Sequence, residues 1–227
     1  MTYEEYFSDW TKVIDYNELT KVLMKVNIEY NTKNIMPRYE DIFKAFTLCS
    51  LHDTKIVMVG LDPYPQRGVA TGILFANHKD VSEENLSSSL KIIKEAVIDF
   101  AVPHNIITFD NSLESWCKQG ILMLNSALTV ELNKVGSHIM LWRKFICNLL
   151  TNICKYETGL IFVLFGQQAQ TFSPYINSKY NTIINEKHPA WYARTGNKMS
   201  HSLFTTISNM CMDKYGIPIK WYEEEHF

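Results

Sequence analysis

Four apolar segments of strand length constrain the fold of this chain more than any other feature of its sequence. None of them alternates between polar and apolar residues, as a strand with one solvent-exposed face does. Continuous apolarity is typical of strands that are covered on both faces, as in a parallel sheet between two layers of helices. The segments are Lys55–Gly60, Gly120–Asn125, Leu160–Gly166 and Thr182–Asn185.

Segments with helical periodicity flank and separate these four runs. Leu19, Val22, Leu23 and Val26 follow the i, i+3, i+4, i+7 spacing of one helix face. Strands that alternate with helices predict an α/β fold, here a three-layer α/β/α sandwich with a central four-stranded, mainly parallel sheet. The expected helices are Tyr16–Tyr30, Leu86–Phe100, Asn111–Lys118, Trp142–Tyr156 and Ser200–Asp213.

Length and composition favour one compact domain. The chain has 227 residues, 46% of them hydrophobic, and no repeat or Pro/Gly/Ser-rich linker divides it. We expect residues 1–227 to form a single domain, with residues 1–50 as a helical part packed on the rest.

No apolar run reaches the roughly 18 residues of a membrane span, and the acidic N-terminus lacks the features of a signal peptide. The expectation is a soluble, intracellular monomer that is not secreted and lies in the cytoplasm or nucleus according to the host.

Neither a metal nor an organic cofactor is expected. The five cysteines are odd in number and form no C-x-x-C pair, so buried free thiols are expected rather than disulfides or a zinc site. The chain contains no H-E-x-x-H spacing. Its glycines fit neither G-x-G-x-x-G nor the Walker phosphate loop.

The distribution of charge leaves nucleic-acid binding open. The net charge of −2 argues against it, because contacts with phosphates need local positive potential. Between Glu186 and Asp213, however, there is no acidic residue, while Lys187, Arg194 and Lys198 supply positive charge. The segment predicts one basic face, and ordinary solvated charge explains it equally well.

Polar residues stand where the expected strands end. Asp62 follows the first strand, Asn125 ends the second, and His188 follows the fourth. Because ligands bind beyond the carboxyl ends of parallel strands, these residues predict a site at one edge of the sheet. Each residue taken alone has an ordinary alternative: a turn aspartate, an amide that satisfies loop backbone, or a packed structural histidine. Phe75 is by default a core residue.

Five motifs occur in one order along the chain. They are Gly60–Pro65 with Ala70–Phe75, Leu113–Trp116 with Gly120–Asn125 and Leu128–Val130, Ser137-His138, Val163–Gln170, and Lys187–Ala190. Together they resemble the family 1 uracil-DNA glycosylases, whose usual forms include G-Q-D-P-Y-H, L-L-N-x-x-L-T-V, L-W-G-x-x-A-Q and H-P-S-P-L. Asp9-Trp10 and Ile219–Trp221 also fit, so the resemblance runs from about residue 9 to residue 221.

The resemblance implies that a uracil base is flipped out of DNA into a closed pocket, as base-processing enzymes require. By their positions in the motifs, Phe75 is implied to stack on the uracil ring, and main-chain groups at Leu61 are implied to recognise the base. Asn125 is implied to bond the N3–H and O4 edge, which rejects cytosine. Tyr64 is implied to stand against C5, where it excludes the methyl group of thymine.

The resemblance also implies a hydrolysis that leaves an abasic site in base excision repair. Asp62, kept ionised, is implied to stabilise the cationic sugar and to orient or deprotonate the attacking water. His188 is implied to donate a hydrogen bond to O2 of the departing base. No metal or cofactor takes part in this scheme.

Contacts with DNA are implied around the same site. Hydroxyls and backbone N–H groups bind phosphates without reading sequence. The family's wedge, a side chain that enters the emptied base stack, is aligned with Tyr192, and Trp191 is an equal candidate. The implied DNA-contacting residues are Ser87, Ser88, Ser137, His138, Gly166, Gln167, Trp191, Tyr192 and Arg194.

Two residues depart from the family pattern. Leu61 replaces a glutamine, and Pro65 replaces a histidine, which removes a side chain and an N–H near the catalytic water. Poxvirus-type members resemble this sequence at these two positions.

Besides uracil-containing DNA, single- or double-stranded, the resemblance implies a replication or polymerase partner or a proteinaceous inhibitor. The alternatives are a non-catalytic DNA-binding or polymerase-processivity module with this fold, and another base specificity, against which Tyr64 argues.

Overall fold

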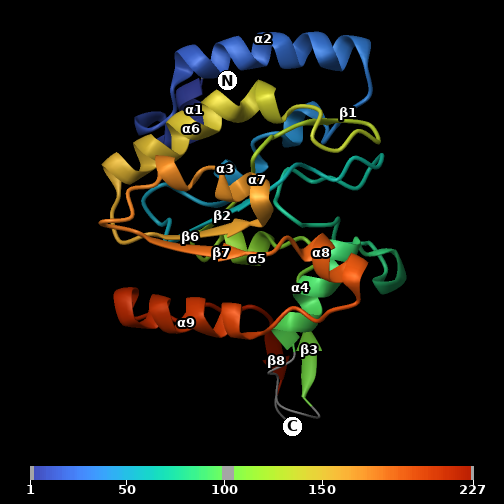
Figure 1. Cartoon of the computed structure of the whole chain (residues 1–227), viewed down its shortest axis with the longest axis vertical. Helices are drawn as coiled ribbons and strands as arrows, with labels where there is room; N and C mark the ends of the chain where they lie inside the picture. Colours follow the sequence, from blue (N-terminus) through green and yellow to red (C-terminus); the bar gives the residue numbers. More distant parts are fainter. Residues whose placement is uncertain (1–2, 99–104, 226–227) are drawn as a thin grey trace.

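The computed structural model describes residues 3–98 and 105–225. Its centre is a four-stranded sheet in the order β4-β2-β6-β7 (Figure 1). All three strand pairs are parallel, so the predicted sheet is confirmed and the four carboxyl ends lie at one edge. The strands are β2 (Ile56–Gly60), β4 (Ile121–Asn125), β6 (Ile161–Phe165) and β7 (Thr182–Glu186).

Burial follows the position of each strand in the sheet. Every residue of β2, β4 and β6 is buried, as their unbroken apolar sequences predict. β7 is half-exposed, because it lies at the edge and pairs only with β6 among the described strands. The prediction that the fourth strand is covered on both faces is therefore wrong.

Helices cover both faces of the sheet. Figure 1 shows α2 (Tyr16–Thr32) and α6 (Ile139–Tyr156) on one side and α9 (Ser202–Tyr215) on the other. The three-layer architecture is thus confirmed. α2 begins after Asp15, whose carboxylate accepts the N–H of Glu18 at 3.0 Å and caps the helix.

The N-terminal part joins the same hydrophobic core as the sheet, which extends from Phe7 to Trp221. Trp10 anchors this part, because its ring N–H donates to the C=O of Cys49 at 2.8 Å. Its ring also packs edge-on against Phe46 at 5.2 Å between centroids. The elements here are α1 (Tyr3–Phe7), η1 (Ser8–Lys12), η2 (Tyr39–Asp41) and α3 (Lys44–Leu48).

Several shorter helices connect the strands, and among them α4 packs against α8. The predicted helix at 86–100 begins two residues late, and its last two residues lie outside the described part of the chain. The predicted helix at 111–118 contracts to four residues, because the Asp110 carboxylate accepts the N–H groups of Ser112 and Ser115 and holds a turn there. The elements are η3 (Glu83–Asn85), α4 (Ser88–Ile98), α5 (Glu114–Cys117), α7 (Gly166–Gln170), η4 (Ser173–Tyr175) and α8 (Pro189–Thr195).

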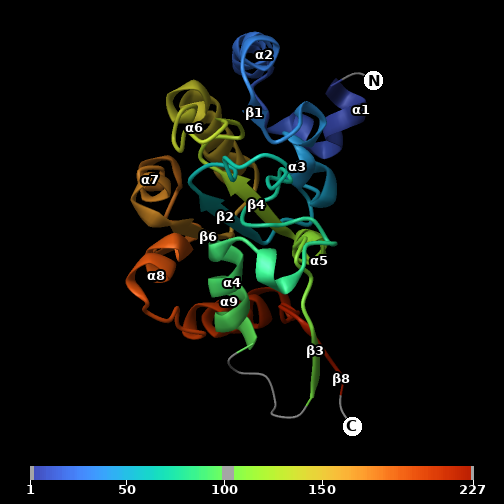
Figure 2. The ribbon, with the colours of Figure 1, turned by 90° about the vertical axis from the view of Figure 1, so that its right-hand side faces the viewer.

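Two antiparallel ribbons lie outside the main sheet, and neither was predicted because each strand has only two or three residues. β1 (Ile35–Met36) pairs with β5 (Val130–Glu131). β3 (Ile106–Thr108) pairs with β8 (Glu223–Glu225) and projects from the body (Figures 1 and 2). Such pairing depends on residues far apart in the sequence, which local patterns do not reveal.

All five cysteines are free and buried, as predicted. Burial raises the pKa of the Cys49 thiol to about 11. Among the described residues, no helix combines the length and apolarity needed to cross a bilayer.

Candidate active site

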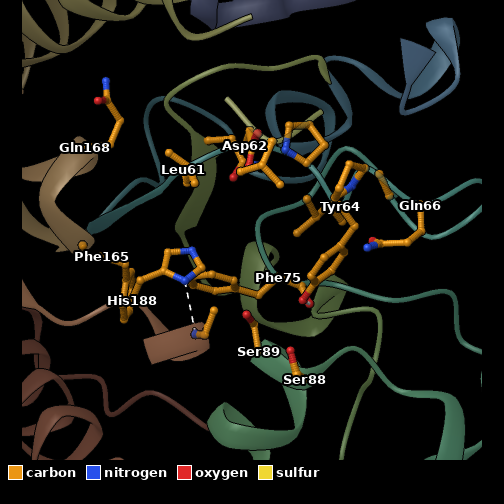
Figure 3. A pocket seen from close by; sticks show the side chains of 18 of the residues that line it. Leu61, Asp62, Tyr64, Gln66, Phe75, Ser88, Ser89, Phe165, Gln168 and His188 are labelled. Atoms are coloured by element: carbon orange, nitrogen blue, oxygen red, sulfur yellow. Dashed lines mark hydrogen bonds between the residues drawn. The ribbon is translucent and has the colours of Figure 1, made fainter. Parts of the chain in front are cut away.

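A pocket of about 320 Å³ lies beyond the carboxyl ends of the parallel strands. Asp62, Phe75, Asn125 and His188 all line it, although they come from four separate segments. Figure 3 shows the ring of Phe75 beside the imidazole of His188, with Leu61 and Asp62 across from them. The topology therefore brings together the polar residues that end the predicted strands.

The segment after β2 is held close to β4. A Cβ at Gly60 would lie 2.2 Å from Leu74 Cδ1 and 3.3 Å from Asn125 Oδ1, so a larger residue would displace the Leu74 side chain. The Gly60 C=O accepts the hydroxyl of Ser126 at 2.6 Å, and the Leu61 C=O accepts the N–H of Ala127 at 3.2 Å. These bonds fix the backbone that leads to Asp62.

Asp62 is a half-buried carboxylate with one backbone donor. The N–H of Gly136 donates to its Oδ2 at 2.5 Å. Burial raises the pKa of Asp62 to about 6, against the lowering effect of that hydrogen bond. A carboxylate with a pKa near neutrality is ionised at pH 7 and is a stronger base than an exposed aspartate. Sequence reasoning missed Gly136, which only the fold brings to Asp62.

His188 is oriented as a neutral hydrogen-bond donor. It precedes α8, and its Nδ1 accepts the N–H of Ala190 at 3.2 Å (Figure 3). Burial and the nearby charge of Arg194 lower the pKa of His188 to about 4. Because Nδ1 is an acceptor, the proton of the neutral ring resides on Nε2. Gly166 lets the histidine sit close, since a Cβ there would lie 3.0 Å from His188 Cβ.

Phe75 adopts a backbone conformation that is rare for a bulky residue, with φ at +63°. Its ring makes edge contacts with Phe165 at 5.2 Å and His188 at 5.4 Å between centroids. The Tyr64 hydroxyl donates to the Phe75 C=O at 2.9 Å and holds this conformation. Strain of this kind clusters at binding sites, where the surrounding structure enforces it.

Asn125 brings an unsatisfied polar atom to the pocket. Its side chain is 6% exposed, and its Oδ1 has no hydrogen-bond partner among the described residues. An unpaired buried acceptor costs about 1–3 kcal/mol. An N–H group of a ligand in the pocket would remove that penalty.

The segment before α4 closes the pocket beside Tyr64. Ser88 is exposed, whereas Ser87 turns both its N–H and its hydroxyl to the side chain of Asn77. The inward position of Ser87 differs from the expected direct contact with DNA. Ser89, which also lines the pocket, belongs to the serine run that the motif places at the phosphate loop, whereas Asn77 was not singled out by the sequence.

α7 and α8 form the remaining rim. Gly166, Gln167 and Arg194 line the pocket, as the motifs lead one to expect. On α8 the Tyr192 hydroxyl donates to Glu186 Oε1 at 2.8 Å, and the ammonium of Lys187 lies 3.7 Å from the centre of the Trp191 ring. Both aromatic side chains are half-exposed.

His138 and Ser137 occupy the segment that also carries Gly136. The His138 side chain is 5% exposed, and its Nδ1 bonds the Thr129 hydroxyl at 2.7 Å. Its Nε2 lies 3.8 Å from the Glu29 carboxylate. The interior position of His138 differs from the expected contact with a phosphate. Ser137 is exposed, and its hydroxyl accepts the N–H of Glu131.

Among the described residues, no group of three or more His, Cys, Asp or Glu side chains is arranged to hold a metal ion. The polar groups that meet in the pocket are a carboxylate, an imidazole and an amide. Such a set suits acid–base chemistry and hydrogen bonding to a planar heterocycle.

Comparison with known proteins agrees with this reading. A model of the uracil DNA glycosylase superfamily matches residues 46–209. The chain is 34% identical over 221 residues to a uracil-DNA glycosylase of Campylobacter jejuni subsp. jejuni, with 94% of this chain and 92% of the relative covered. This chain therefore belongs to the uracil-DNA glycosylase family, and the family 1 resemblance is confirmed. The likeness to poxvirus-type members stays a prediction.

Solved structures support the fold. The crystal structure of mimivirus uracil-DNA glycosylase matches 97% of this chain and 93% of its own length, with a TM-score of 0.72 and 23% identity. A second mimivirus structure, of a variant in complex with UGI, covers 96% of this chain and 93% of its own, with a TM-score of 0.73 and 22% identity.

Proposed function

We propose that this chain binds a uracil base flipped out of DNA and hydrolyses its N-glycosidic bond. The product is an abasic site, the intermediate of base excision repair. The observation that carries the proposal is the placement of Asp62 and His188 in one pocket, with the ring of Phe75 beside His188 and Asp62 across from both. Cleavage of this bond needs a negative group on the sugar side and a hydrogen-bond donor on the base side.

Recognition of uracil follows from the walls of the pocket. Phe75 stacks on the flipped base, and Asn125 bonds its N3–H and O4. The unpaired Oδ1 of Asn125 supports this role, because uracil offers an N–H where cytosine offers only an acceptor. Tyr64 stands against C5 and excludes the methyl group of thymine. Its hydroxyl is tied to the Phe75 C=O, so the wall does not give way easily. Main-chain groups at Leu61 complete the reading of the base.

The chemistry separates charge across one bond. As the bond breaks, the sugar gains positive charge and the base gains negative charge. Asp62, with a pKa raised to about 6, is ionised at pH 7; it stabilises the sugar cation and orients or deprotonates water. His188, neutral because burial lowers its pKa to about 4, donates its Nε2–H to O2 of the departing uracil. Neither step needs a metal.

DNA is held at the rim of the pocket by groups that bind phosphates irrespective of sequence. Ser88, Ser137, Gly166, Gln167 and Arg194 supply hydroxyl, backbone and guanidinium donors. Ser87 and His138 act from within the protein, because their polar atoms bond to other residues.

The wedge that fills the emptied base stack comes from α8. Tyr192 is a candidate by its position in the motif, and the neighbouring Trp191 is an equal one. Aromatic rings of this size unstack bases when they insert between them. A proteinaceous inhibitor is also proposed as a partner, because a mimivirus variant of similar fold was solved in complex with UGI. A replication or polymerase partner stays a prediction.

The proposal is tested with matched labelled oligonucleotides that contain a single U, T or C. The protein is incubated with each in the presence of EDTA, and alkali then reveals abasic sites. Cleavage at U alone, unaffected by EDTA, is the expected result. Folded protein that binds DNA but produces no abasic site would instead favour a non-catalytic DNA-binding or processivity module.

A further inference from the structure

Asn77 is a buried polar residue that has no part in the chemistry described above. Its side chain is 1% exposed and lies two residues beyond Phe75. Its Oδ1 accepts the backbone N–H of Ser87 at 2.8 Å, and its Nδ2 donates to Ser87 Oγ at 2.8 Å. Its own N–H donates to the C=O of Asn111 at 2.9 Å. The side-chain amide of Asn77 therefore bonds Ser87 through both its oxygen and its nitrogen, while the backbone N–H of Asn77 bonds Asn111.

Ser87 is the residue from which α4 starts. Its C=O accepts the N–H of Lys91 at 3.0 Å, the first bond of the helix. Ser88 and Ser89 follow and line the pocket on the side of Phe75 and Tyr64 (Figure 3). The position of Ser87 therefore determines where the exposed Ser88 lies relative to a base bound in the pocket.

Tyr64 lies beside the same two segments. Its hydroxyl donates to the Phe75 C=O, and Ser88 and Ser89 line the same pocket as Tyr64 and Phe75. The bonds between Asn77 and Ser87 therefore join the base-stacking wall to the start of α4.

Around the start of α4, the side chain of Leu86 is buried, whereas those of Glu83, Glu84, Asn85 and Ser88 are exposed. The bonds from Asn77 add a second fixed point to this segment. A run of serines lacks the fixed φ that proline would give a rigid loop. Hydrogen bonds from a buried side chain can supply the missing constraint, because a group held in place loses less entropy when it binds its ligand.

We propose that Asn77 is a positioning residue that fixes Ser87 and Ser88 relative to Phe75 and Tyr64. A DNA phosphate bound at Ser88 then places the attached nucleotide in register with the base pocket. This inference rests on the proposed function, since it assumes that DNA reaches the pocket past Ser88. It assigns Asn77 no contact with the substrate.

The test compares Asn77→Ala with Asn181→Ala. Asn181 is also buried, at 6% exposure, and its amide likewise accepts a backbone N–H, from Leu160, and donates to a C=O, of Asn177. It lies where β6 and β7 begin, away from the pocket. Both variants are expected to lose similar thermal stability. Only Asn77→Ala is expected to raise KM for uracil-containing DNA, by about 10-fold, with kcat within about 3-fold of wild type.

A rescue separates positioning from general damage. Leu86 has φ −57° and ψ 142°, which suits the residue before a proline. Ser87→Pro alone leaves Asn77 Oδ1 without its donor, and it is expected to raise KM. In the Asn77→Ala background the same proline has no N–H to satisfy and fixes φ, so the double variant is expected to recover to within about 3-fold of wild-type KM.

Three results would overturn the inference: an unchanged KM in Asn77→Ala, an equal rise in Asn181→Ala, or a double variant no better than Asn77→Ala. If Asn77→Ala does not fold, Ser87→Pro breaks the same bond from the surface side. The Kd for an oligonucleotide without uracil is measured in parallel. A wild-type protein without cleavage would contradict the proposed function, and the ratio of Kd values would still decide the role of Asn77.

Discussion

His188 and His138 occupy two regions that look alike chemically and differ in what they serve. Both rings are largely buried, burial lowers the pKa of both, and both use Nδ1 in a hydrogen bond. His188 follows β7 at the carboxyl edge and lines the pocket. His138 precedes α6, and its Nε2 faces the Glu29 carboxylate of α2 inside the protein. The surroundings of Nε2 therefore distinguish the two histidines. In His188 this nitrogen belongs to a ring that lines the pocket, and in His138 it faces a carboxylate of the protein.

The interior histidine still contributes to the site at a distance. The Thr129 hydroxyl that bonds His138 also accepts the ring N–H of Trp142 at 2.7 Å. These two bonds connect the start of α6 to the segment that follows β4. Two residues before His138, Gly136 donates its N–H to Asp62. His138 therefore stabilises the segment that presents this donor.

The largest difference expected between the two histidines is in the rate of uracil release. We expect His188→Gln to slow uracil release by about 10²–10³-fold in single-turnover assays, because a donor to the developing base anion is lost or misplaced. We expect His138→Gln to keep the rate within about 10-fold of wild type and to lower the free energy of unfolding by about 1–3 kcal/mol, the cost of disturbing a buried hydrogen bond. Equal losses of rate in both variants, with unchanged stability, would break the comparison.

Much of this arrangement could be predicted from the sequence. The unbroken apolar runs predict the parallel sheet, and the polar residues at the strand ends predict Asp62, Asn125 and His188 at one edge. Motif position alone could not show that His138 is buried rather than exposed to DNA, since its burial depends on how α2 packs across α6. Gly136 and Asn77 were missed for the same reason: their partners Asp62 and Ser87 are fixed by tertiary contacts and not by spacing along the chain.

The pH dependence of the rate sharpens the contrast between Asp62 and His188. We expect kcat/KM to fall about 10-fold per pH unit below about 6, where Asp62 becomes protonated. His188, with a pKa of about 4, is expected to add a second loss only at lower pH. The measurement is kcat/KM for a uracil oligonucleotide between pH 4 and 8. A rate that rises as the pH falls from 7 to 5 would contradict both assignments.

A smaller effect is expected in the pH dependence of stability, where the two histidines should behave alike. Burial lowers the pKa of each folded histidine, so the folded ring stays neutral at pH values at which the unfolded chain binds a proton. For His188, the unfolded state binds more protons than the folded state between about pH 4 and pH 6.5. Acidification through that window should cost about 2–3 kcal/mol, and His188→Gln should remove this cost. His138→Gln should flatten the slope in the same direction. Denaturant titrations at several pH values measure both, and a steeper acid slope in either variant would contradict the burial of a neutral ring.

The central claim is that Asp62 acts on the sugar side of the bond while His188 acts on the base side. Its most direct test is the single-turnover rate of uracil release by Asp62→Asn, with EDTA present and with DNA affinity measured on the same preparation. Asparagine keeps an acceptor for the Gly136 N–H and removes only the charge. The account predicts a rate about 10²–10⁴-fold below wild type with DNA affinity retained. A rate within a few-fold of wild type would contradict it.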